Sequence, residues 1–143
     1  MMKQAFFISC FFSFLFTFPQ DSTHVKVEAP KIVAKLYLGK TYQIEDVQIK
    51  FSDVLSDSRC PEDVTCMWAG EAAVLIDVLK DDVIIKQKKL VFQPGKKMDD
   101  NLMNLFSSEK HSVLALGILP NLNSNIKIKK EDYYLQLEII KKE

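Results

Sequence analysis

Apolar and polar residues alternate along much of this chain with a period of two. In residues 31–38, side chains such as Ile32 and Leu36 would lie on one face and the lysines on the other. A second strand is expected from residue 43 onward, where Val47, Ile49 and Phe51 repeat the alternation, and its phase slips at residues 54–55, which suits a β-bulge or a bend. Both runs predict half-buried strands.

A β-hairpin is predicted in the middle of the chain. Residues 72–79 are almost continuously apolar, as expected of a strand inside a sheet. Residues 80–82 are polar and predict a turn, after which residues 83–92 return as a strand rich in lysine. Such lysines are typical of a solvated face or of a protected sheet edge, and Pro94 and Gly95 end the pattern.

The last third of the chain predicts one short helix and three strands. Residues 99–106 have helical spacing behind an aspartate that can cap the helix. The strand patterns cover residues 111–119, 126–128 and 133–139. In total, about seven short strands with polar turns predict an all-β fold, a single antiparallel β-sandwich of immunoglobulin-like size. A small barrel is the alternative.

The first 22 residues have the pattern of a secretory signal peptide. Lys3 provides the positive start, and residues 5–18 form an apolar stretch dominated by phenylalanine. The stretch breaks at Pro19, too early for a stable membrane span, so we expect cleavage near residues 19–22. We therefore expect three parts: the signal peptide, a short polar lead over 23–30 and one domain over 31–143.

Export places the mature protein in the periplasm or outside the cell. Cys10 follows a small residue, as a lipidated cysteine does, but the apolar stretch continues well beyond it. A lipoprotein is therefore the weaker reading, and Cys10 is expected to leave with the signal peptide. Cys60 and Cys66 then remain as an even pair in an oxidising compartment, which predicts a disulfide. Closing so short a ring stabilises the fold by about 2.4 kcal/mol, enough to fix a loop.

Composition argues against several functional classes. The chain has 19 basic and 19 acidic side chains, so it lacks the basic field that nucleic acid binding requires. Its two histidines, His24 and His111, are distant from the cysteine pair, and we expect no metal and no cofactor. His111 precedes Ser112, but no nucleophile motif accompanies them, so we expect no enzymatic activity.

Residues 57–70 hold the chain's only arginine and only tryptophan, together with Cys60 and Cys66. In this segment Pro61 stiffens the chain and Gly70 permits a backbone conformation that other residues resist. We therefore interpret it as a rigid loop.

Arg59 and Trp68 have two interpretations. In the structural one, which we favour, Trp68 covers the disulfide or the open end of the sandwich, and Arg59 stacks on it or pairs with Asp57 or Asp53. In the other, the rigid loop is presented to a partner.

The order Asp-Ser-Arg-Cys-Pro, a short spacer and then Cys-x-Trp-Ala-Gly resembles a family of small exported bacterial proteins of uncharacterised function. The resemblance is specific over residues 57–70 and extends loosely over the mature domain. It implies export and a β-rich domain, and it carries no assigned activity or site residue.

The leading functional hypothesis is a non-enzymatic binding or accessory domain whose disulfide loop meets another exported protein. The alternative is a proteinase inhibitor that presents residues 61–65 to a protease cleft. A small hydrolase is a third, weaker reading, because the sequence shows no convergent set of catalytic groups.

Overall fold

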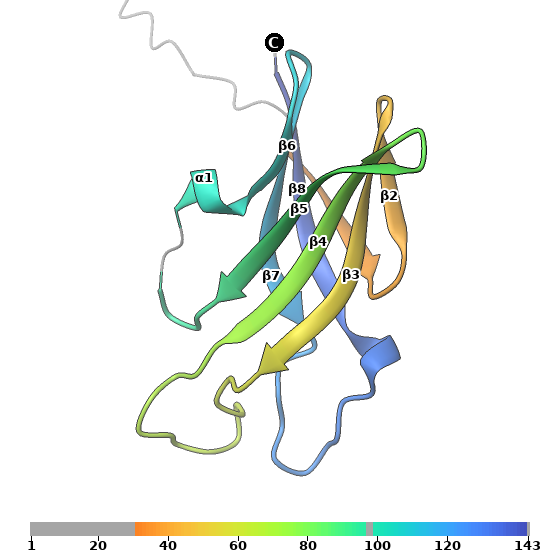
Figure 1. Cartoon of the computed structure of the whole chain (residues 1–143). Helices are drawn as coiled ribbons and strands as arrows, with labels where there is room; N and C mark the ends of the chain where they lie inside the picture. Colours follow the sequence, from red (N-terminus) through yellow and green to blue (C-terminus); the bar gives the residue numbers. More distant parts are fainter. Residues whose placement is uncertain (1–30, 97–98, 143) are drawn as a thin grey trace, which may run out of the picture.

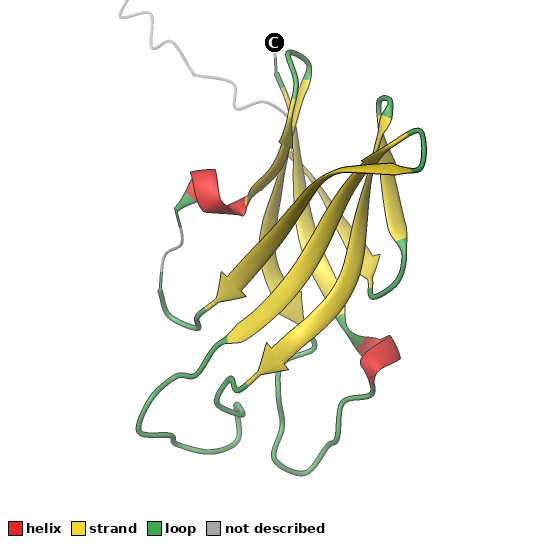
Figure 2. Ribbon diagram, in the orientation of Figure 1, coloured by secondary structure: helices red, strands yellow, loops and turns green. Residues whose placement is uncertain are grey.

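The chain folds as two four-stranded antiparallel sheets that face each other, as the computed structural model shows for residues 31–96 and 99–142 (Figures 1 and 2). This confirms the predicted all-β sandwich. The predicted signal peptide and the lead, residues 1–30, lie outside the described residues.

Each sheet mixes strands from both halves of the chain. In spatial order, the first sheet contains β1 (Lys31–Tyr37), β8 (Tyr134–Lys141), β7 (His111–Leu119) and β6 (Asn104–Ser107). The second contains β2 (Thr41–Ile44), β3 (Val47–Asp57), β4 (Ala72–Lys80) and β5 (Val83–Phe92). The chain therefore crosses from one sheet to the other between β1 and β2 and again after β5.

The predicted central hairpin is confirmed. Strands β4 and β5 pair around a two-residue turn in which Asp81 and Asp82 have φ angles of 51° and 60°. Positive φ at both turn positions matches the twist of a tight hairpin. Strand β4 lies inside its sheet and is mostly buried, whereas the lysine-rich β5 forms the edge.

Strand β3 carries the irregularity predicted from its sequence. Its pairing with β4 shifts between Phe51 and Asp53 and again between Val54 and Ser56. The shifts bend β3 before it enters residues 58–70, so the bulge helps to direct this segment away from the sheet.

Three expectations need correction. The predicted helix over residues 99–106 is confined to α1 (Asp100–Met103), with Asp99 as N-cap, and the chain then continues as β6. Leu105 is buried in β6, whose neighbours Asn104 and Phe106 pair with β7, so strand pairing and burial outweigh the helical spacing. The expected strand over 126–128 is wrong, because only an isolated bridge between Asn123 and Ile126 forms there.

The single strand expected from residue 43 to residue 51 is a hairpin. Strands β2 and β3 are separated by a turn in which Glu45 has a φ of 52°. A short 3-10 helix, Lys130–Asp132, precedes β8.

The core lies between the two sheets and draws on every strand. Its fully buried side chains include Ile49, Phe51, Val74, Ile76, Val113, Leu135 and Leu137. Residues 58–70 contribute none of the side chains of this hydrophobic core, so the loop that they form lies outside it. Of the helices that the structure describes, none has the length and apolar character needed to span a membrane.

Candidate functional site

The segment singled out in the sequence connects β3 to β4 and lies at one end of the sandwich, beside the connection between β7 and β8 (Figure 1). We call residues 58–70 the disulfide loop and residues 120–133 the neighbouring loop. Together they form the candidate site.

The disulfide loop is held at its base by hydrogen bonds that continue the strand pairing. Ser58 N–H donates to the carbonyl of Glu71 at 2.8 Å, and Cys60 N–H donates to that of Ala69 at 2.9 Å. Beyond them, Cys60 and Cys66 form the predicted disulfide, with 6.0 Å between their Cα atoms. Backbone hydrogen bonds therefore hold the base of the loop, and the disulfide closes a covalent ring in the part that extends beyond them.

Gly70 occupies a position that tolerates no side chain. Its φ is +69°, and a Cβ atom placed there would lie 1.8 Å from the carbonyl oxygen of Ser58. The two backbones approach so closely that only glycine fits. The role expected for Gly70 is therefore confirmed, and close packing is a second reason for it beside the φ angle.

Arg59 makes the paired contact that its uniqueness suggested. Its side chain is buried, and it donates from Nε to Oδ1 of Asp57 at 2.9 Å and from Nη2 to Oδ2 at 2.7 Å. Of the two aspartates considered from the sequence, Asp53 instead lies 3.5 Å from Nζ of Lys130. A two-pronged contact of this kind requires the planar guanidinium, which explains why lysine does not stand here.

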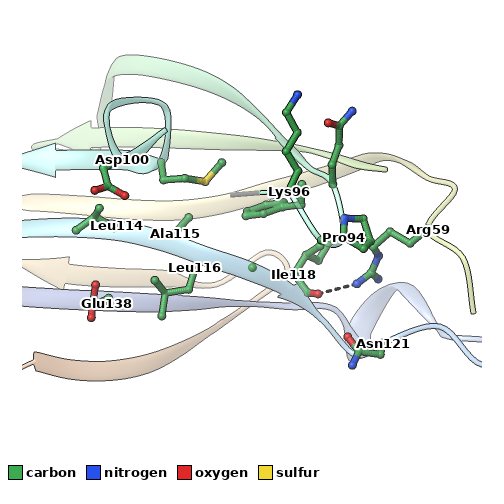
Figure 3. A pocket seen from close by; sticks show the side chains of 15 residues that line it. Arg59, Pro94, Lys96, Asp100, Leu114, Ala115, Leu116, Ile118, Asn121 and Glu138 are labelled. Atoms are coloured by element: carbon green, nitrogen blue, oxygen red, sulfur yellow. Dashed lines mark hydrogen bonds between the residues drawn. The ribbon is translucent and has the colours of Figure 1, made fainter. Parts of the chain in front are cut away.

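Arg59 also joins the two sheets. Its Nη1 donates to the carbonyl of Ile118 at 2.7 Å (Figure 3), and its Nη2 donates to that of Pro120 at 3.0 Å. From the other side, the hydroxyl of Tyr133 donates to Oδ2 of Asp57 at 3.0 Å. The group Asp57, Arg59 and Tyr133, which we call the arginine clamp, thus links the end of β3 to the end of β7 and the start of β8.

The clamp shifts the ionisation of its members. Burial by itself raises the pKa of Asp57, but the hydrogen bonds and charge of Arg59 and the hydroxyl of Tyr133 lower it, and the net pKa lies below its ordinary 3.8. Burial and the contact with Asp57 raise the pKa of Tyr133 above its ordinary 10.0. At neutral pH the clamp is an ion pair with a neutral tyrosine.

The neighbouring loop is tied to the disulfide ring. The carboxylate of Asp63 accepts from the backbone N–H of Ser124 at 2.8 Å, from the hydroxyl of Ser124 and from Nδ2 of Asn125 at 3.3 Å. Glu62 N–H donates to the carbonyl of Leu122 at 3.0 Å. These contacts, together with the disulfide, hold the two loops as one unit.

Large apolar side chains project from this unit into solvent. Trp68 is 65% exposed and Met67 is fully exposed, and Val64 on the same loop and Ile126 on the neighbouring loop are exposed as well. Trp68 is therefore too exposed to plug the open end of the sandwich, whereas the pairing of Arg59 with Asp57 that the structural interpretation also expected is present.

His111 and Ser108 share one carboxylate, that of Glu45. Nδ1 of His111 lies 2.7 Å from Oε1 of Glu45, and the hydroxyl of Ser108 donates to the same oxygen. A serine activated by histidine would instead bond to the imidazole, so these groups act as a link between two hairpins. The hydroxyl of Ser112 accepts from Nδ2 of Asn104. Within residues 31–96 and 99–142, no group of three or more His, Cys, Asp or Glu side chains is placed to hold a metal ion.

The structure thus brings together Asp57, Arg59, Pro61 and Gly70 as the organising part of the loop and leaves Trp68 on its surface. It adds Tyr133 and Asp63, which the sequence did not single out. Tyr133 is 76 positions from Asp57, and no local pattern signals that contact.

Comparison with protein-family models, with curated proteins and with solved structures finds no significant match to this chain. The candidate site is therefore defined by its own geometry: a rigid paired-loop unit that presents an exposed tryptophan and methionine.

Proposed function

We propose that this protein is an exported, non-enzymatic binding protein that meets another exported protein through its disulfide loop. The observation that carries the proposal is that Trp68 and Met67, two large apolar side chains, stand exposed on a loop that is closed by a disulfide and held by hydrogen bonds at its base. A group of large apolar side chains exposed together is typical of a surface that a partner covers.

Rigidity and exposure together favour recognition. Tryptophan is the residue most enriched among those that dominate binding energy, and methionine adapts its shape to an apolar pocket. Because the disulfide, the arginine clamp and the contacts of Asp63 already fix the backbone, binding costs little ordering entropy. Val64 and Ile126 flank the two anchors and would extend the apolar contact.

Export supports the same proposal. A disulfide persists in an oxidising compartment, and the first 22 residues have the pattern of a secretory signal. The partner would then be a periplasmic or extracellular protein with an apolar pocket for Trp68.

Proteinase inhibition is placed second. A substrate-like inhibitor presents an extended segment, whereas residues 61–64 form a turn in which Val64 N–H donates to the carbonyl of Pro61 at 3.4 Å. The side chain of Asp63 is also occupied by Ser124. These contacts favour a binding surface built on Trp68 over a loop that enters a protease cleft.

Affinity capture tests the proposal. The immobilised protein should retain a specific exported protein, and Trp68→Ala and Met67→Ala should each weaken that complex by about tenfold or more. Ile84→Ala is the matched control, because Ile84 is comparably exposed but lies beside the β4–β5 turn, in a different part of the chain.

Two outcomes would contradict the proposal. One is capture that survives both loop substitutions, and the other is capture that Ile84→Ala reduces to the same extent. Adding a panel of proteases to the same assay separates the second candidate: inhibition that depends on residues 61–65 and not on Trp68 would favour the inhibitor.

A further inference from the structure

A slot of about 430 Å³ opens at the side of the sandwich, away from the exposed Trp68. Figure 3 shows it running along β7, with Leu116 and Ile118 on one side and Pro94, Lys96 and Asp100 on the other. Phe92, Met103 and Ala115, which belong to the hydrophobic core, also line it. The slot therefore gives access to core side chains from the edge of the first sheet.

The slot lies where the first sheet lacks a strand. Strand β6 pairs with β7 only as far as Leu114, because β6 begins at Asn104 and the residues before it form α1 outside the sheet. Among the described strands, none pairs with Ala115–Leu119 on the side away from β8. At the Ile118 end of the slot, Arg59 donates a hydrogen bond to the carbonyl of Ile118, so the arginine clamp closes the slot at that end. What remains is the place of a short additional strand.

The chain itself contains a segment of matching chemistry. In the lead that precedes β1, Val25, Val27 and Ala29 alternate with His24, Lys26 and Glu28. This is the period of a strand with one small apolar face and one charged face. The apolar face suits the core side chains of the slot, and the mouth carries charges of both signs, in Lys96, Asp100 and Glu138.

The segment cannot reach the slot of its own molecule. Lys31 lies opposite Ile140 on β8, and Ile140 pairs with Ser112 on β7. The slot is three strand spacings from β1, about 14 Å, and begins three residues further along β7, about 10 Å. Residue 29 lies within about 7 Å of residue 31, because two residues span no more than that. Residues 24–29 can therefore fill the slot along their whole length only when they come from another copy of the chain.

We propose that residues 24–29 of one molecule add as a strand to the free edge of β7 in a second molecule. Backbone hydrogen bonds to the edge would provide affinity, and the alternating valines entering the slot would provide specificity. This inference does not depend on the proposed binding function, because neither Trp68 nor Met67 lines the slot.

Complementation between two variants tests it in the exported chain. The double substitution Val25→Asp with Val27→Asp removes the apolar face of the donor segment, residues 24–29, and leaves the residues of the slot unchanged. Leu116→Arg fills the slot but keeps the donor, and it leaves the core intact because Leu116 is half-exposed. Sedimentation velocity should find the wild type associated and each variant monomeric. A mixture of the two variants should recover a one-to-one complex, since one good donor and one good slot remain.

Lys26→Asp with Glu28→Lys is the control, because it changes the charged face alone and should shift the dissociation constant by less than about tenfold. Circular dichroism of each variant confirms that the fold is retained. A wild type that stays monomeric at millimolar concentration overturns the inference. So does association that survives the valine substitutions, or a mixture that remains monomeric.

Discussion

Arg59 and Asp57 face each other through two hydrogen bonds, and both side chains are only 7% exposed. The residues stand two positions apart, where β3 leaves its sheet, yet the guanidinium reaches the carbonyls of Ile118 and Pro120 in the other sheet. A local ion pair thereby becomes a connection between the two layers. The same contacts fix the position of Arg59, the second residue of the disulfide loop, relative to the end of β3.

Arg59→Lys should lower the free energy of unfolding by about 1–3 kcal/mol. Lysine retains the positive charge but cannot contact both carboxylate oxygens and two carbonyls at once. Thermal and urea unfolding of the variant measure the effect, with Lys89→Arg as control because Lys89 is exposed on the edge strand β5. Equal stability of wild type and Arg59→Lys would show that charge alone suffices.

The clamp should also make stability depend on pH. Because the pKa of Asp57 lies below its ordinary 3.8 in the folded state, its ionised form stabilises the fold. That contribution is present above about pH 3.8 and is lost as the pH falls through the lowered folded-state pKa. Asp57→Asn, which leaves Arg59 buried without its counterion, should cost about 3–5 kcal/mol at neutral pH.

Urea unfolding between pH 2 and pH 7 measures this difference. The difference in the free energy of unfolding between wild type and Asp57→Asn should become smaller toward pH 2, because protonated Asp57 is uncharged like asparagine. Other carboxylates with lowered pKa, such as Glu45 and Asp63, affect both proteins equally and cancel in the comparison. A gap that stays constant across the range would contradict the assignment.

How far the sequence predicts this fold depends on the range of the contacts involved. Alternation in residues 31–38 predicts a strand, because the side chains of a strand point to its two faces in turn, and residues 83–92 are predicted as the return strand that follows a polar turn. The same reasoning fails at Leu105, whose helical spacing is overruled by pairing with β7. Ile126 fails for another reason: it alternates with lysine as a strand residue would, but it forms only an isolated bridge with Asn123.

The candidate site divides in the same way. The pairing of Cys60 with Cys66 and the salt bridge of Arg59 are local, and composition alone draws attention to them. The contacts of Tyr133 with Asp57 and of Ser124 with Asp63 join residues more than 60 positions apart. Such contacts depend on how β7 and β8 are connected, which no pattern within residues 57–70 contains.

Gly70→Ala should be among the most damaging single substitutions in this protein. Adopting a positive φ costs alanine about 1–2 kcal/mol, and the clash with the Ser58 carbonyl comes in addition, for a total of about 3 kcal/mol or more. Gly39→Ala is the matched control, because Gly39 has a φ of +77° but open space around its Cα. The unfolding midpoint should fall further for Gly70→Ala than for Gly39→Ala. Equal decreases would mean that the backbone at Ser58 shifts at little cost in free energy.

The disulfide should hold the loop more than the fold. Replacing Cys60 and Cys66 together by serine should remove about 2.4 kcal/mol, the value for closing so short a ring, while the β circular dichroism spectrum is retained. In the native, non-reduced protein, neither cysteine should react with a thiol reagent. Full labelling of both would exclude the bridge and, with it, the rigid loop on which the proposed recognition depends.

Because Trp68 is the only tryptophan, its fluorescence reports on the candidate surface without interference from other indoles. An indole that is 65% exposed should emit at long wavelength and be quenched readily by acrylamide, and unfolding should change this emission little. Trp68→Ala should alter the free energy of unfolding by less than about 0.5 kcal/mol, as expected at an exposed position. Emission at short wavelength that acrylamide does not quench, together with a large decrease in the free energy of unfolding of Trp68→Ala, would instead show that Trp68 packs against the protein. Protection that develops only when the partner is added is the result expected of a recognition surface.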